Sequence, residues 1–184
     1  MPFTEEQILE LCYIAYPWAI KSEEEDEVEA VVSVAEKSTD APKWLQDQID
    51  QGKEVYMKAA TGGGMCFTCH QVNGEGLVGQ FPPLAGSEWV SADPGVITNI
   101  ILKGLKGEIL VKGEKYGTSA AVNMAAVPIS DREIANVSTY VRQAWGNSSD
   151  EVSEDFVKQV RADYTNKQDQ WTGDELKSLY STSF

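Results

Sequence analysis

The sequence predicts an all-α protein in which a central core carries helical extensions at both ends. The first observation is charge: residues 1–50 hold 13 acidic and 3 basic side chains, residues 51–149 hold 8 of each, and residues 150–184 hold 8 and 4. The second is that most of the 15 glycines lie in the neutral middle. The third is the helical spacing of apolar residues in both acidic flanks. A length of 184 residues suits one domain with sizeable extensions.

The N-terminal extension, residues 1–48, carries two helix signals. Thr4 and Gln7 form a capping-box start. Apolar side chains then follow at helical spacing, at Ile8, Leu11, Cys12 and Ala15, until Pro17 interrupts the pattern. The acidic run of residues 23–27 is typical of the solvated start of a second helix, with a docking site as the alternative.

The C-terminal extension, residues 148–184, also carries two helix signals. Ser153 is the first helix cap, and Thr172 with Glu175 forms a capping box for a second, short helix. The apolar side chains that follow these caps are Phe156, Val157, Val160, Leu176, Leu179 and Tyr180. Each of the two extensions therefore has an apolar face that could pack on the core.

Composition excludes several classes of protein. Five Trp, seven Tyr and five Phe exclude a wholly disordered acidic chain, and no apolar run is long enough for a transmembrane helix. The formal net charge of −14 argues against a nucleic-acid partner, because phosphate binding needs clustered Lys and Arg. We therefore expect neither a membrane span nor a nucleic-acid partner.

The chemistry-bearing motif is Cys66-Phe67-Thr68-Cys69-His70. Two cysteines separated by two residues and followed by histidine are typical of covalent c-type haem attachment. The two thiols form thioethers with the haem vinyl groups, and the imidazole binds the iron. The motif therefore predicts one covalent haem c held by Cys66 and Cys69, with His70 as the proximal iron ligand.

Two other interpretations of the motif remain open. A zinc site could use the same three residues with Cys12, although adjacent Cys69 and His70 would have difficulty facing one tetrahedral ion. A thioredoxin-like dithiol would need a βαβ context, whereas residues 71–86 form a Gly- and Pro-containing loop. In the haem interpretation Cys12 is the odd thiol, either buried and free or joined to another chain.

A haem also needs a distal ligand or an open distal site. His70 is the only histidine, so a second histidine ligand within the chain is excluded and four methionines remain. Met1 is terminal, Met57 precedes the motif on a predicted helix, and Met65 adjoins Cys66. Met124 is left, in a loop of small residues, and is the predicted distal ligand; the alternative is a Met that only fills the core.

The middle of the chain, residues 49–147, resembles the class I, single-haem cytochromes c that serve periplasmic dehydrogenases and respiratory complexes. Besides Cys66 to His70, the resemblance rests on four further runs of sequence. These are Asn73-Gly74-Glu75-Gly76, Phe81-Pro82-Pro83-Leu84-Ala85-Gly86-Ser87, Gly104-Leu105-Lys106-Gly107 and Tyr140-Val141-Arg142. The implied fold wraps three to five helices and their loops around the haem.

The resemblance also implies roles for single residues. The carbonyl of Pro82 would accept the imidazole N–H of His70, and Leu84 would pack on the haem plane. A helix around Gly52 would cross a second helix capped by Ser130 and Glu133, with the glycine allowing close approach. The indole N–H of Trp89 could reach a haem propionate, or Trp89 could be a buried aromatic.

One segment departs from the family pattern. The distal Met is commonly followed by Pro and preceded closely by Tyr, whereas Met124 is followed by Ala125-Ala126-Val127-Pro128 and lies eight residues after Tyr116. The function implied by the resemblance is one-electron transfer, as a carrier or as the cytochrome subunit of an oxidoreductase. An open distal site would instead favour a haem enzyme or a small-ligand sensor.

Partners and location follow from the same resemblance. It implies redox proteins as partners, namely a dehydrogenase, an oxidase or another cytochrome, and a periplasmic or otherwise extracytoplasmic location. Residues 1–6 lack a signal-peptide pattern, so we expect a processed or recombinant form or an excised domain. We also expect the acidic extensions to steer partners from a distance, while a near-neutral face around the haem edge makes the contact.

Overall fold

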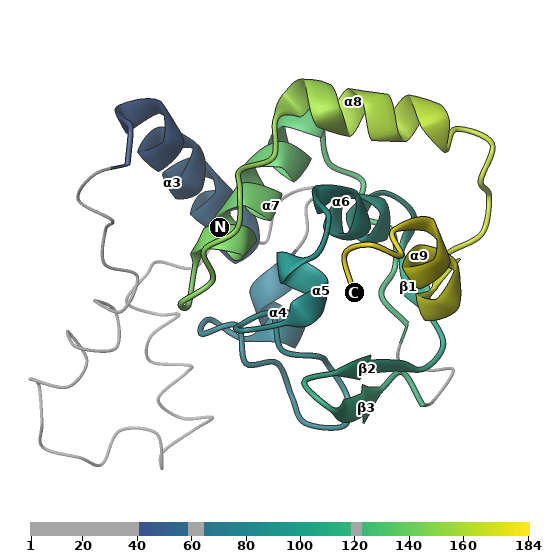
Figure 1. Ribbon diagram of the computed structural model, residues 1–184. Helices are drawn as coiled ribbons and strands as arrows, with labels where there is room; N and C mark the ends of the chain where they lie inside the picture. Colours follow the sequence, from purple (N-terminus) through teal and green to yellow (C-terminus); the bar gives the residue numbers. More distant parts are fainter. Residues whose placement is uncertain (1–40, 59–64, 119–122) are drawn as a thin grey trace, which may run out of the picture. The chain divides into compact units, whose positions relative to one another are not determined.

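Two helices that pack side by side, α3 and α7, form the most extensive contact of the fold (Figure 1). The computed structural model describes residues 41–58, 65–118 and 123–184, which belong to one unit of the chain. The helices predicted within residues 1–40 lie outside the described residues. The elements are α3 (Lys43–Met57), α4 (Cys66–His70), α5 (Glu88–Ser91), α6 (Pro94–Lys103), β1 (Leu105–Lys106), β2 (Ile109–Val111), β3 (Glu114–Tyr116), α7 (Asp131–Gln143), α8 (Glu154–Asp163), β4 (Trp171–Thr172) and α9 (Gly173–Leu179).

The contact between α3 and α7 depends on Gly52. A Cβ at this position would lie 2.6 Å from the carbonyl carbon of Asn136 and 2.7 Å from Cβ of Tyr140. No side chain fits there, so the predicted role of Gly52 in a close helix crossing is confirmed. Helix α3 begins at Lys43, so the boundary expected between residues 48 and 49 falls inside this helix.

The predicted caps of the other long helices are also present. Ser130 and Glu133 form a complete capping box at the start of α7, and the Ser153 hydroxyl accepts the Phe156 N–H at the start of α8. Thr172 and Glu175 form the capping box of α9. Each cap satisfies backbone N–H groups that a helix start leaves without partners, and this explains why these helices begin where the sequence predicts.

The strands were not among the elements expected from the sequence. β2 and β3 form an antiparallel hairpin, and β1 pairs in parallel with β4, with Leu105 opposite Trp171 and Lys106 opposite Thr172. Strands of two or three residues are too short to show an alternating pattern. The chain remains mostly helical, in agreement with the predicted fold class.

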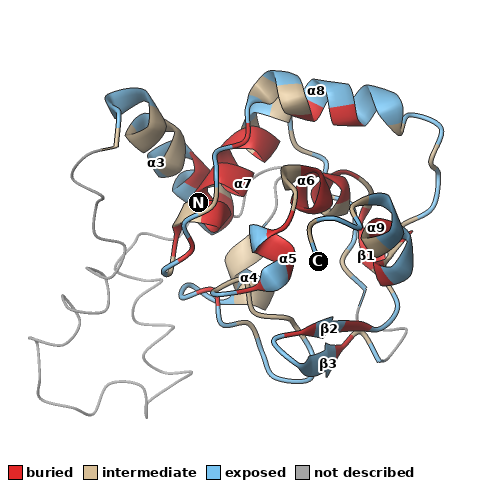
Figure 2. Ribbon diagram, viewed as in Figure 1, coloured by how far each residue is buried: buried red, intermediate tan, exposed pale blue. Residues whose placement is uncertain are grey.

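Two clusters of buried side chains form the core (Figure 2). The first gathers apolar residues of α6 and α7 with Tyr56, and it includes Val157 and Val160 of α8. The second surrounds Trp89 and includes Trp171 and Leu176 from the C-terminal extension. Residues 148–184 therefore contribute buried side chains to both clusters and form an integral part of the folded core.

Candidate haem site

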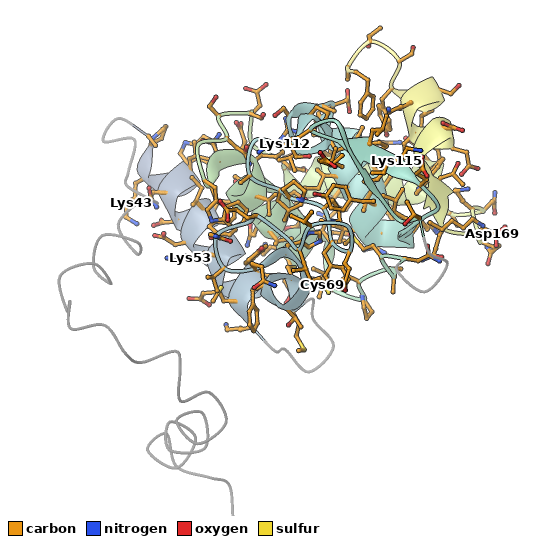
Figure 3. All side chains as sticks on the ribbon, turned by 90° about the horizontal axis from the view of Figure 1, so that it is seen from below. Lys43, Lys53, Cys69, Lys112, Lys115 and Asp169 are labelled. Atoms are coloured by element: carbon orange, nitrogen blue, oxygen red, sulfur yellow. The ribbon has the colours of Figure 1, made fainter. Side chains whose placement is uncertain are left out.

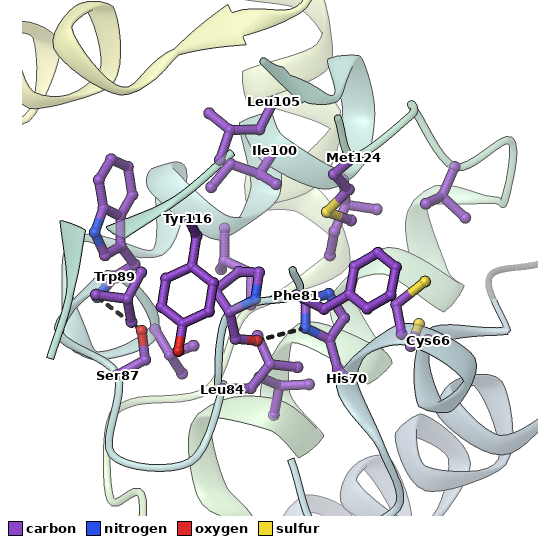
Figure 4. A pocket seen from close by; sticks show the side chains of 18 of the residues that line it. Cys66, His70, Phe81, Leu84, Ser87, Trp89, Ile100, Leu105, Tyr116 and Met124 are labelled. Atoms are coloured by element: carbon purple, nitrogen blue, oxygen red, sulfur yellow. Dashed lines mark hydrogen bonds between the residues drawn. The ribbon is translucent and has the colours of Figure 1, made fainter. Parts of the chain in front are cut away.

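A cavity of about 550 Å³ lies between the two clusters, and it collects the predicted haem-binding residues (Figure 4). Cys66, Cys69, His70 and Met124 all line it. Most of the remaining wall is apolar, with side chains such as Leu84, Ile97, Ile101, Leu105, Val137 and Val141. An apolar space of this size, with a few converging polar groups, suits a large flat cofactor.

Helix α4 sets the spacing of the motif. Cys66, Cys69 and His70 occupy positions i, i+3 and i+4, which share one face of a helix. Met65 before the helix and Gln71 after it both have positive φ, at 34° and 63°, so the chain turns sharply at each end. Burial raises the pKa of the Cys66 thiol to about 11. Both cysteine side chains are half-buried at the wall of the cavity.

The imidazole of His70 is held by Pro82. Its Nδ1 lies 2.9 Å from the Pro82 carbonyl oxygen. A carbonyl only accepts hydrogen bonds, so Nδ1 carries the proton and Nε2 keeps its lone pair free for a metal. Burial lowers the pKa of His70 and favours the neutral ring. This is the hydrogen bond that the resemblance implied.

A glycine-containing loop positions Pro82. Gly74 and Gly76 have φ of 69° and 64°, and a Cβ on Gly76 would lie 2.6 Å from the Pro82 carbonyl oxygen. The Leu84 N–H donates to the Gly74 carbonyl at 2.6 Å. Pro82 therefore sits in a turn that folds back tightly on itself and presents its carbonyl to His70. The Asn147 side chain supports this turn, accepting from the Gly86 N–H at 2.9 Å and donating to the Leu84 carbonyl at 3.1 Å.

Met124 lies on the wall opposite His70, near Leu105 and Ile100 (Figure 4). Its backbone forms a closed pair with Leu105, with N–H to O distances of 2.9 and 3.0 Å. The Gln170 side-chain amide also donates to the Met124 carbonyl at 2.8 Å. The structure therefore brings Met124 into the predicted cavity, with its backbone tied to two distant segments.

Leu84 and Trp89 also line the cavity. Of the two roles predicted for Trp89, the structure favours the buried aromatic over the bond to a haem propionate. Its indole N–H donates to the Leu110 carbonyl at 2.7 Å, and its side chain is buried. The indole N–H that could have reached a haem propionate therefore has a partner within the protein. Trp89 is the buried aromatic of the alternative interpretation.

The lysine-containing segment 103–115 has less free charge than its composition indicates (Figure 3). Lys115 pairs with Glu108 at 2.8 Å, and the Lys112 ammonium donates to the Ala85 carbonyl at 3.3 Å. The Lys112 backbone N–H also donates to the Glu88 carboxylate. The ion pair balances the charge of Lys115, whereas the hydrogen bonds of Lys112 hold its side chain and backbone in place without removing its charge.

Sequence reasoning missed several residues of the site. Tyr116 from β3 lines the cavity and is buried, and Gln170 reaches Met124 from the far end of the chain. A single polar residue between two helices carries no signal of such a contact. The zinc interpretation gains no support, because Cys66, Cys69 and His70 do not form a metal-binding group of three within the described residues; Cys12 lies outside them.

Comparison with known proteins identifies the family. The profile of the family Cytochrome c matches residues 49–145, which is more than half of the chain. The chain belongs to the cytochrome c family. It therefore carries covalently attached haem c at the C-x-x-C-H motif.

Three bacterial relatives show where similar domains occur. The chain is 40% identical over 87 residues to cytochrome c-552 of Thermus thermophilus, a match covering 45% of this chain and 64% of that protein. It is 32% identical over 108 residues to the cytochrome c subunit of alcohol dehydrogenase (quinone) from Gluconobacter oxydans, covering 55% and 20%. The fructose dehydrogenase cytochrome subunit of Gluconobacter japonicus is 34% identical over 105 residues, covering 53% and 20%. The chain thus matches less than two thirds of the length of each of these relatives.

Among the described residues, no helix is long and apolar enough to cross a bilayer.

Proposed function

We propose that this cytochrome transfers single electrons between redox proteins, with His70 and Met124 as the two axial ligands of its haem iron. The observation that carries the proposal is the placement of both side chains on opposite walls of one apolar cavity that also contains Cys66 and Cys69 (Figure 4). The residues present fit haem c, because the thiols, the neutral imidazole and the thioether sulfur are the groups that this cofactor uses.

Each of these residues has a separate task. Bound haem c supplies a one-electron Fe(III)/Fe(II) couple. His70 would hold the iron through Nε2 while Pro82 fixes its tautomer, and Met124 would supply a thioether sulfur that favours the reduced state. The apolar wall excludes water, which raises the cost of the extra charge in the oxidised state. With both faces closed, electrons pass at the haem edge and no substrate reaches the iron.

The partners we propose are redox proteins, either a dehydrogenase, an oxidase or another cytochrome. Support comes from relatives that are named as cytochrome subunits of dehydrogenases and from the balance of 8 acidic and 8 basic side chains in residues 51–149. We also propose a periplasmic or otherwise extracytoplasmic location, because haem c attachment takes place outside the cytoplasm. The acidic extensions would add long-range steering to a contact made by the rim.

The test is the spectrum of the holo-protein made with haem c maturation machinery. We expect a low-spin spectrum in both oxidation states, with the charge-transfer band of Met-ligated ferric haem. Met124→Ala should convert the ferric iron to high spin. Met57→Ala is the matched control, because Met57 lies on the exposed side of α3 and away from the cavity.

Other outcomes point to other functions. A low-spin spectrum that Met124→Ala leaves unchanged would overturn the ligand assignment. A high-spin ferric spectrum in the unmodified protein would show an open distal site, and it would favour a haem enzyme or a small-ligand sensor. One zinc ion bound per chain, without haem, would rule out electron transfer through haem.

A further inference from the structure

Met124 lies at the junction of the two core clusters, and its side chain packs against both. It belongs to residues 123–128, which form neither helix nor strand, and the residues directly after it are small. Its position is therefore set by contacts with other segments rather than by regular structure of its own. Those contacts come from β1 and from the C-terminal extension.

The carbonyl of Met124 accepts two hydrogen bonds. One comes from the Leu105 N–H at 2.9 Å and the other from the Gln170 side-chain amide at 2.8 Å. A carbonyl oxygen has two lone pairs, so both acceptor positions are used. The two donors lie on different segments, and together they restrict the backbone of Met124 more than the pair with Leu105 alone.

The same C-terminal segment also contains β4, the strand that pairs with β1. Trp171 follows Gln170 directly, pairs with Leu105, and donates its N–H to the Gly104 carbonyl at 3.1 Å. Gly104 has φ of 82°, and a Cβ there would lie 2.5 Å from the Met124 carbonyl oxygen and 3.0 Å from the Gln170 amide nitrogen. Three segments therefore meet at Gly104 with no space for another atom.

The C-terminal segment is itself firmly anchored. Leu176 is fully buried, and a Cβ on Gly173 would lie 2.7 Å from the Ile109 side chain. Trp171 packs edge-on against Tyr164, at 5.1 Å between ring centroids. At the far end of α9, the Tyr180 hydroxyl accepts from the Asn99 amide at 2.8 Å. Gln170 is thus presented from a rigid support.

We propose that Gln170 is a positioning residue for the distal ligand, and that the C-terminal extension acts as a brace that keeps Met124 on the iron. The inference rests on the proposed ligation by Met124. Removing the Gln170 amide leaves the extension folded but frees one lone pair of the Met124 carbonyl. Met124 then leaves the iron more easily, and an external ligand takes its place at lower concentration.

The experiment is imidazole titration of the ferric holo-protein, monitored by the change in haem absorption and, in proteins that keep Met124, also by loss of the Met charge-transfer band. Gln170→Ala should bind imidazole about fivefold more tightly than the unmodified protein, as expected when one neutral hydrogen bond is lost. Gln168→Ala is the matched control, since Gln168 is an exposed residue of the same loop. It should bind imidazole as the unmodified protein does. Far-UV circular dichroism checks that both variants remain folded.

A second pair of variants separates the two proposals. In Met124→Ala no side chain competes with imidazole, so adding Gln170→Ala should change the affinity less than twofold. An equal change in both backgrounds would overturn the positioning role, because Gln170 would then act on the cavity in general. The positioning role would also be overturned if Gln170→Ala, in a protein that keeps Met124, bound imidazole with unchanged affinity. Failure of Met124→Ala to give high-spin iron would instead overturn the ligation itself.

Discussion

The two walls of the haem cavity are built in different ways. On the proximal wall, His70 and the Pro82 carbonyl that orients it are 12 residues apart. On the distal wall, Met124 and the Gln170 amide that contacts it are 46 residues apart. The hydrogen bond that orients His70 is local, although Asn147 and Lys112 also bind the loop around Pro82. Met124, in contrast, is held by β1 and by the end of the chain.

This difference has an energetic consequence. Closing a longer loop costs more conformational entropy, so the bond from Gln170 to Met124 forms only when the C-terminal extension is packed. Local opening of a protein starts where few contacts hold the chain. We therefore expect the distal ligand to be lost before the proximal one under any mild perturbation. The following predictions test this order.

The largest effect is expected from Leu176→Ala, which leaves a cavity between α9 and the core. A fully buried leucine costs roughly 2–5 kcal/mol when truncated to alanine. In thermal scans, the Met charge-transfer band should disappear well below the temperature at which helix content is lost. Leu179→Ala on the same helix is the control, because Leu179 is 43% exposed and should cost less than about 0.5 kcal/mol. Equal behaviour of the two variants would refute the brace.

Glycine substitutions compare the two walls directly. Gly76 on the proximal wall and Gly104 on the distal wall have positive φ and no space for a Cβ, while Gly79 and Gly107 have similar φ and open surroundings. All four changes to Ala should add backbone strain, but Gly76→Ala and Gly104→Ala should cost roughly 1–3 kcal/mol more from overpacking. Urea unfolding measures this. Only Gly104→Ala should also weaken Met124 ligation.

Trp89→Phe should have a smaller effect. It removes the indole donor to the Leu110 carbonyl and should lower the free energy of unfolding by about 1 kcal/mol. The reduction potential should stay unchanged, because the indole N–H faces the hairpin carbonyl. A clear shift of the potential in voltammetry would show instead that the indole interacts with a haem propionate.

The smallest effect concerns the capping glutamates. A hydrogen bond from the Ser130 side chain lowers the pKa of Glu133, and one from the Thr172 backbone lowers the pKa of Glu175. Their stabilisation is present above the unfolded pKa of about 4.3 and is lost as pH falls through the lower folded value. Chemical unfolding at pH 7 should therefore show both Glu133→Gln and Glu175→Gln as less stable, with the difference vanishing in acid. Only the Glu175 variant should also loosen Met124; a matching effect of Glu133→Gln would contradict the separation of the walls.

Features that depend on neighbouring residues were predictable. The motif from Cys66 to His70 and the capping boxes of α7 and α9 were read from short stretches of sequence, since their geometry is local. The strand pairs were not, because β1 and β4 have two residues each and exist only through each other. The helices expected within residues 1–40 lie outside the described part of the chain, and ligation by Met124 stays a prediction.

The sequence by itself predicted a helical protein with one haem attachment motif, because the i, i+3, i+4 spacing places Cys66, Cys69 and His70 on one face of a helix, and its resemblance to the cytochromes c implied the fold. It also indicated Met124 by elimination among four methionines. Only the tertiary structure decided that the C-terminal extension belongs to the core and reaches Met124 through Gln170. Contacts between segments far apart in the chain depend on packing of the whole fold, and no local pattern of residues records them.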